Sequence, residues 1–263
     1  MKLGIEGRRA LVTGAGRGIG RAIALSLAEE GAQVTIVSRT EEDVARLVED
    51  MGSGASGHRG VAMDLMPNDA PQRLLRELAT NGAESFDIVV HNVGGTLDIT
   101  DPFCSIDEWR RSWRFNMEIA VELNLALVPA MQKKRWGRIL HISSISAIEN
   151  HGPVTYCAVK AALTAYTRSM GRVLAPDGIV MTALLPGAVF TEKGYWDVTS
   201  KERPEHVERY LADRMAIKRL GLPEEMGSLA AFLCSEHASF CIGSVLVADG
   251  GQGRSFQQQP SCA

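Results

Sequence analysis

The stretch ALVTGAGRGIG, residues 10–20, joins a short apolar run to a glycine-rich turn. The run has the length and character of a buried strand, and the residues after the turn predict a helix over 18–30. Glycines at such a turn let backbone amides approach a pyrophosphate at a helix N-terminus, where the helix dipole favours negative charge. Their spacing is Gly14-x-x-x-Gly18-x-Gly20, which differs from the G-x-G-x-x-G dinucleotide fingerprint. A strand before the turn and a helix after it favour a phosphate site over a turn without function.

The rest of the chain alternates short β-rich runs with amphipathic helical stretches, which predicts parallel βαβ units. The apolar runs lack polar alternation, as expected when helices cover both faces of a sheet. The fold class that we predict is α/β, a single-domain Rossmann fold with a doubly wound seven-stranded parallel sheet and helices on both faces. Strands are expected at 10–14, 34–38, 60–64, 86–92, 137–143, 179–187 and 244–251, and two long helices at 106–133 and 153–175.

Residues 1–254 are expected to form this one dinucleotide-binding and catalytic domain, because no linker or composition break divides them. The segment 191–219 is polar, contains aromatic residues and lies between two predicted strands. A long insertion of this kind is usually a substrate lid or binding loop, and we expect it to be partly helical. The residues 255–263 are expected to be a flexible tail.

Composition and charge exclude several classes of protein. The 263 residues are 45% hydrophobic and 22% charged, with a formal charge of −3, which argues for a globular core and against nucleic-acid or anionic-membrane partners. No run approaches the length of a membrane span, and the N-terminus has no signal-peptide core. The cysteines are scattered and the histidines lack metal-ligand spacing, so we predict reduced thiols, no metal and a cytoplasmic location.

The stretch TYCAVKAAL, residues 155–163, places Tyr156 and Lys160 four residues apart, on one face of a predicted helix. A free tyrosine, with a pKa of about 10, is a poor base at neutral pH, and a nearby ammonium lowers that pKa by stabilising the phenolate. The pair can therefore transfer protons. The alternative is a tyrosine with its hydroxyl at the surface and a lysine whose stem lies along apolar surface. A lone Y-x-x-x-K pattern does not separate the two.

Taken with the other motifs, the sequence resembles the short-chain dehydrogenase/reductase family over nearly its whole length. Its glycine turn has the T-G-x-x-x-G-x-G form of that family's cofactor motif. His91 replaces the usual first asparagine of the N-N-A-G element, and Val93 its alanine. The other landmarks follow in register: HNVGG (91–95), Asn116 in RFNMEIA, SS (143–144), YCAVK (156–160), PGAVFT (186–191) and ADGG (248–251).

The resemblance implies a catalytic set. Tyr156 would be the general acid in reduction and the general base in oxidation, with its pKa lowered by Lys160 and the positive nicotinamide ring. Asn116 would hold a water that links Lys160 to solvent, and a serine would hold the substrate oxygen. The usual spacing to the tyrosine selects Ser143, whereas the place in the motif selects Ser144. We choose Ser144, because neighbouring strand residues point to opposite faces and loops absorb a deletion more easily than strands.

The end of the second strand decides between the two nicotinamide cofactors. An acidic residue there would bind the ribose hydroxyls of NAD, but this chain has Ser38 followed by Arg39. Arg17 in the glycine turn can reach the same 2′-phosphate, and arginine forks suit phosphate oxygens. We therefore predict NADP(H), although both arginines could instead be solvated surface residues. The resemblance implies the full cofactor set Gly14, Gly16, Arg17, Gly18, Ile19, Gly20, Ser38, Arg39, Thr40, Asp64, Leu65, Asn92, Val93, Gly94, Tyr156, Lys160, Pro186, Gly187, Val189 and Thr191.

The predicted reaction interconverts a ketone and a secondary alcohol by hydride transfer. Polar residues in the loop 145–155 favour a small polar, cyclic or sugar-like substrate over a bare acyl chain, although they can equally face water. The identity of the substrate and the physiological direction do not follow from the sequence. The expected substrate contacts are Ser144, Ser146, Asn150, His151, Tyr156, Tyr195 and Trp196.

Two other functions compete with this one. A 3-oxoacyl-thioester reductase would use the same catalytic residues, and an acyl-carrier-protein substrate would favour a basic patch, for which Arg110, Arg111 and Arg114 are candidates. A catalytically silent dinucleotide-binding regulator would lack the tyrosine or the lysine, and both are present. The resemblance also implies a homotetramer, or a homodimer, formed through the two long helices and the last strand.

Overall fold

The computed structural model describes residues 2–52, 57–80, 82, 85–149 and 152–254. Its centre is a seven-stranded sheet with the order β3-β2-β1-β4-β5-β6-β7, in which every neighbouring pair is parallel. The predicted tail lies outside the described residues. The strands are β1 (Arg9–Thr13), β2 (Gln33–Ser38), β3 (Arg59–Ala62), β4 (Ile88–His91), β5 (Gly137–Ile142), β6 (Ile179–Pro186) and β7 (Val245–Ala248).

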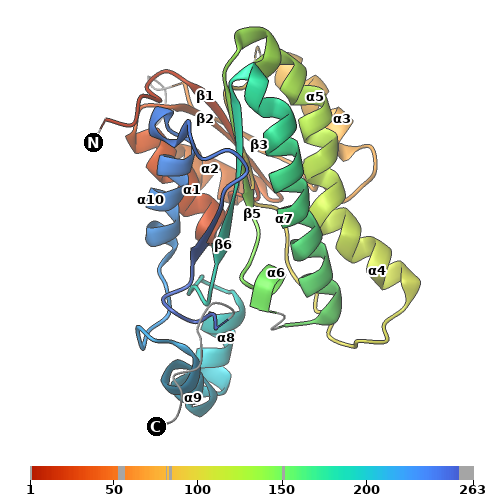
Figure 1. Ribbon diagram of the computed structural model, residues 1–263, viewed down its shortest axis with the longest axis vertical. Coiled ribbons are helices and arrows are strands. Elements are labelled where there is room, and N and C mark those ends of the chain that lie inside the picture. Colours follow the sequence, from red (N-terminus) through yellow and green to blue (C-terminus); the bar gives the residue numbers. More distant parts are fainter. Residues whose placement is uncertain (1, 53–56, 81, 83–84, 150–151, 255–263) are drawn as a thin grey trace.

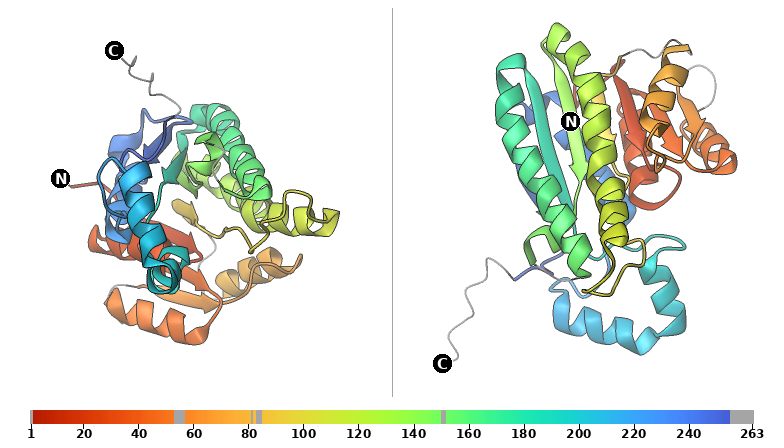
Figure 2. Two further views of the ribbon diagram at one scale, coloured as in Figure 1. Left: turned by 90° about the horizontal axis from the view of Figure 1, so that it is seen from below. Right: turned by 90° about the vertical axis from the view of Figure 1, so that its right-hand side faces the viewer.

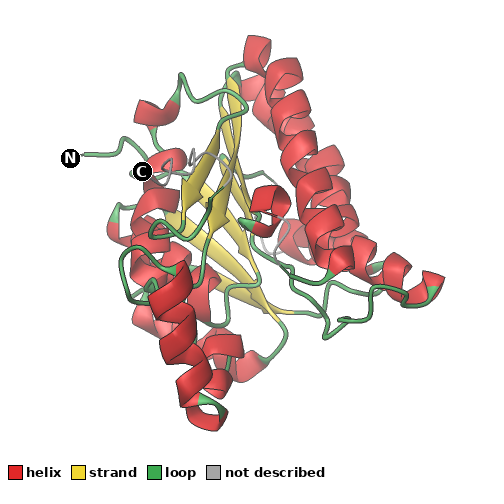
Figure 3. Ribbon diagram, turned by 60° about the horizontal axis from the view of Figure 1, so that its bottom comes forward, coloured by secondary structure: helices red, strands yellow, loops and turns green. Residues whose placement is uncertain are grey.

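Helices cover both faces of the sheet, as Figures 1 and 3 show. One layer consists of α1 (Gly18–Glu29), α2 (Glu41–Asp50) and α10 (Pro223–Leu233), and the other of α3 (Ala70–Thr80), α5 (Ile119–Lys134) and α7 (Val154–Leu174). These two layers and the parallel sheet confirm the predicted fold class. None of the helices in the described part of the chain is long and apolar enough to span a membrane.

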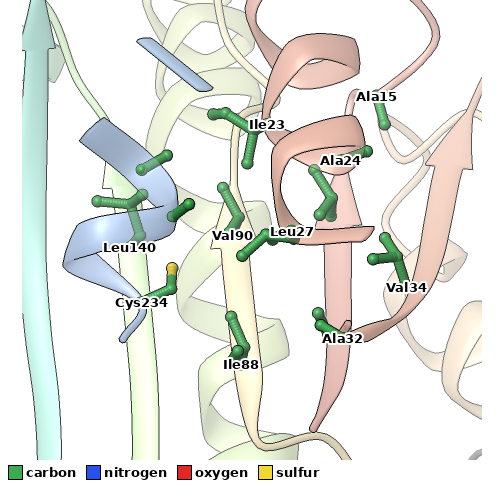
Figure 4. Close-up of a cluster of buried hydrophobic side chains, with 14 of the residues drawn as sticks. Ala15, Ile23, Ala24, Leu27, Ala32, Val34, Ile88, Val90, Leu140 and Cys234 are labelled. Carbon is green, nitrogen blue, oxygen red and sulfur yellow. The ribbon is translucent and has the colours of Figure 1, made fainter. Parts of the chain in front are cut away.

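The apolar strands have their sequence character because each face packs against helices. Ala10 and Val12 of β1 belong to a core cluster with Ile23 and Leu27 of α1, whereas Leu11 belongs to the cluster under α3, α5 and α7. Side chains alternate between the two faces of a strand, so two buried faces require an uninterrupted apolar run. Figure 4 shows the first cluster, in which alanines allow α1 to lie close to the sheet.

The predicted helix over 106–133 is correct in extent but not in regularity. Helix α4 (Ile106–Trp113) starts with a capping box between Ser105 and Glu108, and a π-helical turn, Arg114–Glu118, joins it to α5. A π-helical turn inserts a residue into the helical ladder and is frequent at functional sites. Here the turn carries Asn116.

Two helices, α8 (Tyr195–Glu202) and α9 (Pro204–Arg214), occupy the segment predicted to form a lid. They lie beyond the end of the sheet at which the short helix α6 (Ser146–Glu149) also lies, as Figure 1 and the right-hand view of Figure 2 show. The segment is therefore mostly helical, and it is placed at the edge of the sheet where the strands β1, β4, β5 and β6 end.

Two histidines form a buried pair in the centre of the sheet. His91 of β4 and His141 of β5 are partners in the sheet register, and their rings stack with centroids 5.0 Å apart. Both side chains are almost fully buried. Burial lowers the pKa of His91 to about 4, and burial together with the positions of His91 and Lys160 lowers the pKa of His141 well below its usual value.

The hydrogen bonds of this pair run in one direction. Thr167 donates to the carbonyl of Leu163 at 2.8 Å, so its hydroxyl oxygen must accept from Nδ1 of His141, at 2.9 Å. Nε2 of His141 then accepts from the Asn124 amide at 3.3 Å, and the Asn124 oxygen accepts from Nε2 of His91 at 2.8 Å. His141 is therefore neutral, because a proton added to its Nε2 would place two donors face to face. Nδ1 of His91 is buried without a hydrogen-bond partner among the described residues, and burial keeps that ring neutral as well.

This arrangement predicts a loss of stability in acid. The pKa values of both histidines lie below the unfolded value of about 6.5. Between pH 6.5 and pH 4 the unfolded chain therefore binds more protons than the folded chain. As the pH is lowered through this range, the free energy of unfolding decreases by up to about 1.4 kcal/mol per pH unit for each histidine. Urea unfolding of His141→Asn and His91→Asn between pH 7.5 and pH 4.5 should show a weaker pH dependence than the parent. The exposed His206→Asn should leave it unchanged. If the free energy of unfolding of the two core variants depended on pH as steeply as that of the parent, the prediction would be contradicted.

Candidate active site

The glycine turn lies where the order of strands reverses, between the carboxyl ends of β1 and β4. Ligands of open α/β sheets bind at this crevice. Gly18 begins α1 with a φ of 57°, a left-handed conformation that favours glycine. At Gly20 a Cβ atom would lie 2.4 Å from the Gly14 carbonyl oxygen. The turn therefore could not carry larger side chains at these positions.

The loop after β4 is tied to this turn. The Asn92 amide donates to the Gly14 carbonyl at 2.8 Å, and the backbone N–H of Asn92 donates to the hydroxyl of Thr13 at 3.2 Å. The two loops that the sequence assigns to the cofactor are thus one unit.

Ser38 lies beside the glycine turn, and Arg39 follows it in the chain. Ser38 is buried at the end of β2, and a Cβ atom on Gly16 would lie 2.2 Å from its hydroxyl oxygen. Arg39 and Arg17 are exposed, and neither forms an ion pair with another described residue. Thr40 caps α2 by accepting from the backbone of Asp43 at 3.3 Å.

Helix α7 begins after Pro153 and brings Tyr156 and Lys160 to the end of β5. Lys160 is 2% exposed, its ammonium donates to the carbonyl of Ile142 at 2.9 Å, and its Nζ lies 5.6 Å from the centroid of the Tyr156 ring. The hydroxyl of Ser144 forms a hydrogen bond with the Tyr156 side chain. The structure thus brings this serine, the tyrosine and the lysine together.

The pKa values at this site differ from the sequence-based expectation. Burial raises the pKa of Tyr156, and the hydrogen bond with Ser144 offsets only part of that increase. Burial also lowers the pKa of Lys160 to about 8. Lys160 by itself therefore does not lower the tyrosine pKa, because the lysine lies against the ring while the loss of solvent acts on the hydroxyl. The lowering expected from Lys160 together with the positive nicotinamide ring stays a prediction.

The two serines point in different directions. Ser143 is buried, and its hydroxyl contacts the Lys160 carbonyl and the Thr164 hydroxyl, each at 3.1 Å. Ser144 faces Tyr156, and its oxygen also accepts from the backbone N–H of Ser146 at 3.1 Å. Alternation along the chain thus gives the first serine to the contact between β5 and α7 and the second to the site.

Asn116 is bound by backbone groups. Its Nδ2 donates to the carbonyls of Gly95 and Ser112 at 2.9 and 3.0 Å, and its Oδ1 accepts from the Gly95 N–H at 2.9 Å. A Cβ atom on Gly94 would lie 2.8 Å from both Asn116 Oδ1 and Lys160 Nζ. Asn116 therefore orders the loop after β4 beside the lysine, and its predicted water contact stays a prediction.

These segments line a pocket at the carboxyl ends of β4 and β5. The backbone is closely packed at Gly94 and Gly187, since a side chain at either position would collide with neighbouring residues. Ile142 was not predicted, and it contributes its backbone carbonyl, which no sequence pattern marks. The pocket is lined by Ile19, Asn92, Gly94, Ile142, Ser143, Ser144, Tyr156, Lys160, Pro186 and Gly187.

The other predicted contacts are placed less directly. Asp64 follows β3, where its carboxylate accepts from the Met66 N–H at 3.0 Å. Thr191 lies against Gly18, with its Cγ2 2.9 Å from the position of a Cβ there. Tyr195 and Trp196 start α8, and neither lines this pocket. Asn150 and His151 lie outside the described residues.

The chain is similar to known reductases over most of its length. A family model described as enoyl-(acyl carrier protein) reductase matches residues 14–252. The 3-oxoacyl-(acyl-carrier-protein) reductase of Aquifex aeolicus is 34% identical over 254 residues, which cover 95% of this chain and 99% of the relative.

Solved structures of similar proteins span almost the whole chain. A 3-oxoacyl (acyl-carrier-protein) reductase from Agrobacterium tumefaciens with NADP bound has a TM-score of 0.87 and 29% identity, covering 95% of this chain and 96% of its own. The L-sorbose reductase from Gluconobacter frateurii, complexed with NADPH and L-sorbose, has a TM-score of 0.89 and 27% identity, covering 98% of this chain and 100% of its own. Together with the family match, they show that the chain belongs to the short-chain dehydrogenase/reductase family of oxidoreductases acting on CH–OH and carbonyl groups.

Proposed function

We propose that this protein is an NADP(H)-dependent oxidoreductase that interconverts a ketone and a secondary alcohol on a small, polar, sugar-like substrate. The observation that carries the proposal is the contact of Ser144, Tyr156 and Lys160 in a pocket continuous with the glycine turn. Family membership supports the reaction class.

Each residue has a separate task in this reaction. The reduced nicotinamide, when bound, supplies the hydride. The hydroxyl of Ser144 holds the carbonyl oxygen, on which negative charge develops. The phenol of Tyr156 gives that oxygen its proton, a step typically worth about 10²–10⁴ in rate. The ammonium of Lys160 then stabilises the phenolate, and Asn116 holds the loop beside it.

The cofactor proposal rests on the groups at the end of β2. Ser38 stands where an acidic residue would bind the ribose of NAD, and the exposed Arg39 and Arg17 are available to a 2′-phosphate. Structural relatives hold NADP or NADPH. Both observations favour NADP(H).

The arginines of α4 and of the π-helical turn after it favour this substrate class over an acyl-carrier-protein substrate. Arg114 is buried, pairs with Glu122 at 2.7 Å and donates to the carbonyls of Met66 and Pro67. Arg110 pairs with Asp107 at 2.9 Å. Of the three arginines considered for a carrier protein, burial of Arg114 leaves only Arg110 and Arg111 exposed, which weakens support for a basic patch. Similarity to 3-oxoacyl reductases keeps that activity as the alternative.

The proposed assembly is a homotetramer or a homodimer. Leu125 on α5 is 73% exposed, and Val173 on α7 is 65% exposed. These apolar side chains lie on the two long helices that the resemblance assigns to subunit contacts, which supports the proposal.

Tyr156→Phe should lower kcat at least about 100-fold while the protein keeps its fold and NADPH affinity, because only the proton donor is lost. Ser144→Ala should have a similar effect, since loss of one donor to a developing oxyanion typically costs about 10²–10³ in rate. Ser143→Ala is the matched control and should lose much less. Stopped-flow oxidation of NADPH measures all three. A larger loss in Ser143→Ala than in Ser144→Ala would reverse the assignment of the serine.

A panel of carbonyl substrates tests the substrate class. Reduced-cofactor absorbance should report higher kcat/KM for hydroxylated and cyclic ketones than for acetoacetyl thioesters. The reverse order would favour the 3-oxoacyl-thioester reductase, and no turnover with any carbonyl would favour the silent regulator. The Tyr156→Phe protein supplies the background rate.

Arg39→Ala should weaken NADPH binding about tenfold or more and leave NADH binding nearly unchanged. The reason is that a charge-assisted hydrogen bond to the 2′-phosphate contributes about 1.5–3 kcal/mol. Fluorescence titration of both cofactors provides the measurement, with the exposed Arg111→Ala as the control. Equal weakening of both cofactors would contradict the assignment of Arg39 to the phosphate.

A further inference from the structure

The residues that follow β7 form a compact turn, 249–254, which we name the strap. The carboxylate of Asp249 organises it by accepting from the backbone N–H of Gly251 at 3.0 Å and of Gly253 at 2.7 Å. The Asp249 carbonyl accepts from the N–H of Gln252 at 3.1 Å. The strap therefore presents the Gln252 side chain in a defined direction.

Gln252 joins two segments that are far apart in the sequence. Its Oε1 accepts from the backbone N–H of Ala188 at 2.7 Å, and its Nε2 donates to the hydroxyl of Tyr210. Ala188 follows β6, and Tyr210 is on α9. A backbone N–H can only donate, so the amide has one possible orientation and the tyrosine hydroxyl must accept.

The fit around this link is tight. A Cβ atom on Gly187 would lie 2.6 Å from Gln252 Oε1, and one on Gly251 would lie 2.6 Å from the Ala216 Cβ. The guanidinium of Arg254 donates to the carbonyl of Asp213 at 2.6 Å. The strap thus contacts the segment after β6, the end of α9 and the turn after it.

The link continues to the start of α8. The ring of Tyr210 lies against Trp196, with centroids 4.5 Å apart, and Trp196 in turn contacts Tyr195 at 5.0 Å. Ala188 precedes Val189 and Thr191, two residues proposed to bind the cofactor. One side chain therefore connects the proposed nicotinamide segment to the proposed substrate aromatics.

We propose that Gln252 is a positioning residue for this enzyme. It holds the α8–α9 segment against the segment after β6, and this contact places the bound substrate correctly relative to the bound cofactor. The role rests on the proposed function, in which both segments contact ligands. Gln252 is not among the residues that line the pocket of Tyr156 and Lys160. Its loss therefore changes binding more than the chemical step.

Three variants separate the parts of the link. Gln252→Leu removes both hydrogen bonds while keeping a similar volume. Tyr210→Phe removes only the bond to α9. The control is Gln132→Leu, which breaks a side-chain hydrogen bond to Asp177 of 2.7 Å at the opposite end of α5 from the π-helical turn.

The first measurement is hydrogen exchange of the ligand-free protein. Amides in the range 195–214 should exchange about fivefold faster in Gln252→Leu and Tyr210→Phe, the size expected for one hydrogen bond. The double variant should match Gln252→Leu alone, because the two side chains form a single link. The control should match the parent. Parental exchange of this range in Gln252→Leu would overturn the proposal.

The second measurement separates binding from chemistry. The NADPH dissociation constant of Gln252→Leu should rise about threefold, and KM for the best ketone about tenfold, with kcat within about threefold of the parent. A lower kcat with KM unchanged would overturn the positioning role.

Failure of the two proposals gives different results. Exchange and NADPH binding do not require a carbonyl substrate, so a response of both in Gln252→Leu supports the link even if no ketone is turned over, which would contradict only the proposed function. Normal turnover with parental exchange in the variant would contradict only the role of Gln252.

Discussion

The buried ammonium of Lys160 is the constraint on which the rest of the site depends. Removing a charge from water is unfavourable, and it lowers the pKa of this lysine to about 8. The carbonyl of Ile142 and the ring of Tyr156 are its partners, both supplied by the junction of β5 and α7. The hydroxyl of Ser143 donates a hydrogen bond to the Lys160 carbonyl and so stabilises the same junction. The interactions that place the lysine thus also place the tyrosine and Ser144.

The polar core behind this junction is compatible with the lysine because it is neutral. His141 lies close enough to Lys160 for the ammonium to lower its pKa, and His91 lowers it further. A second positive charge here would repel the ammonium, and the repulsion would be strong in this low-dielectric interior. The hydrogen bonds that run from His91 through Asn124 to His141 and Thr167 occupy both ring nitrogens of a neutral His141 and Nε2 of His91, while Nδ1 of His91 is buried without a partner among the described residues. Acid would therefore disturb the core and the catalytic junction together.

Local patterns in the sequence predict the fold, and the structure brings Ser144, Tyr156 and Lys160 close together, as those patterns also led us to expect. Buried parallel strands need uninterrupted apolar runs, and the glycine turn and the Tyr156–Lys160 pair depend on residues only a few positions apart. What the sequence does not reveal depends on distant partners. Arg114 is buried because Met66 and Pro67 accept from it across 47 or more residues, and His91 meets His141 only through the register of the sheet. The raised pKa of Tyr156 follows from burial, which a motif does not encode.

The residues proposed for the chemical step depend on local contacts, whereas the residues proposed for substrate binding depend on contacts between distant parts of the chain. The serine, tyrosine and lysine lie within residues 144–160, around one helix start. The proposed substrate aromatics are also tied to the segment after β6 through Tyr210 and Gln252, which are more than 40 residues apart in the chain. Changes in α8, α9 or the strap can therefore alter the proposed substrate binding without disturbing the proposed proton transfer at Tyr156. Relatives with the same fold that act on acyl carriers or on sorbose are what such an arrangement allows.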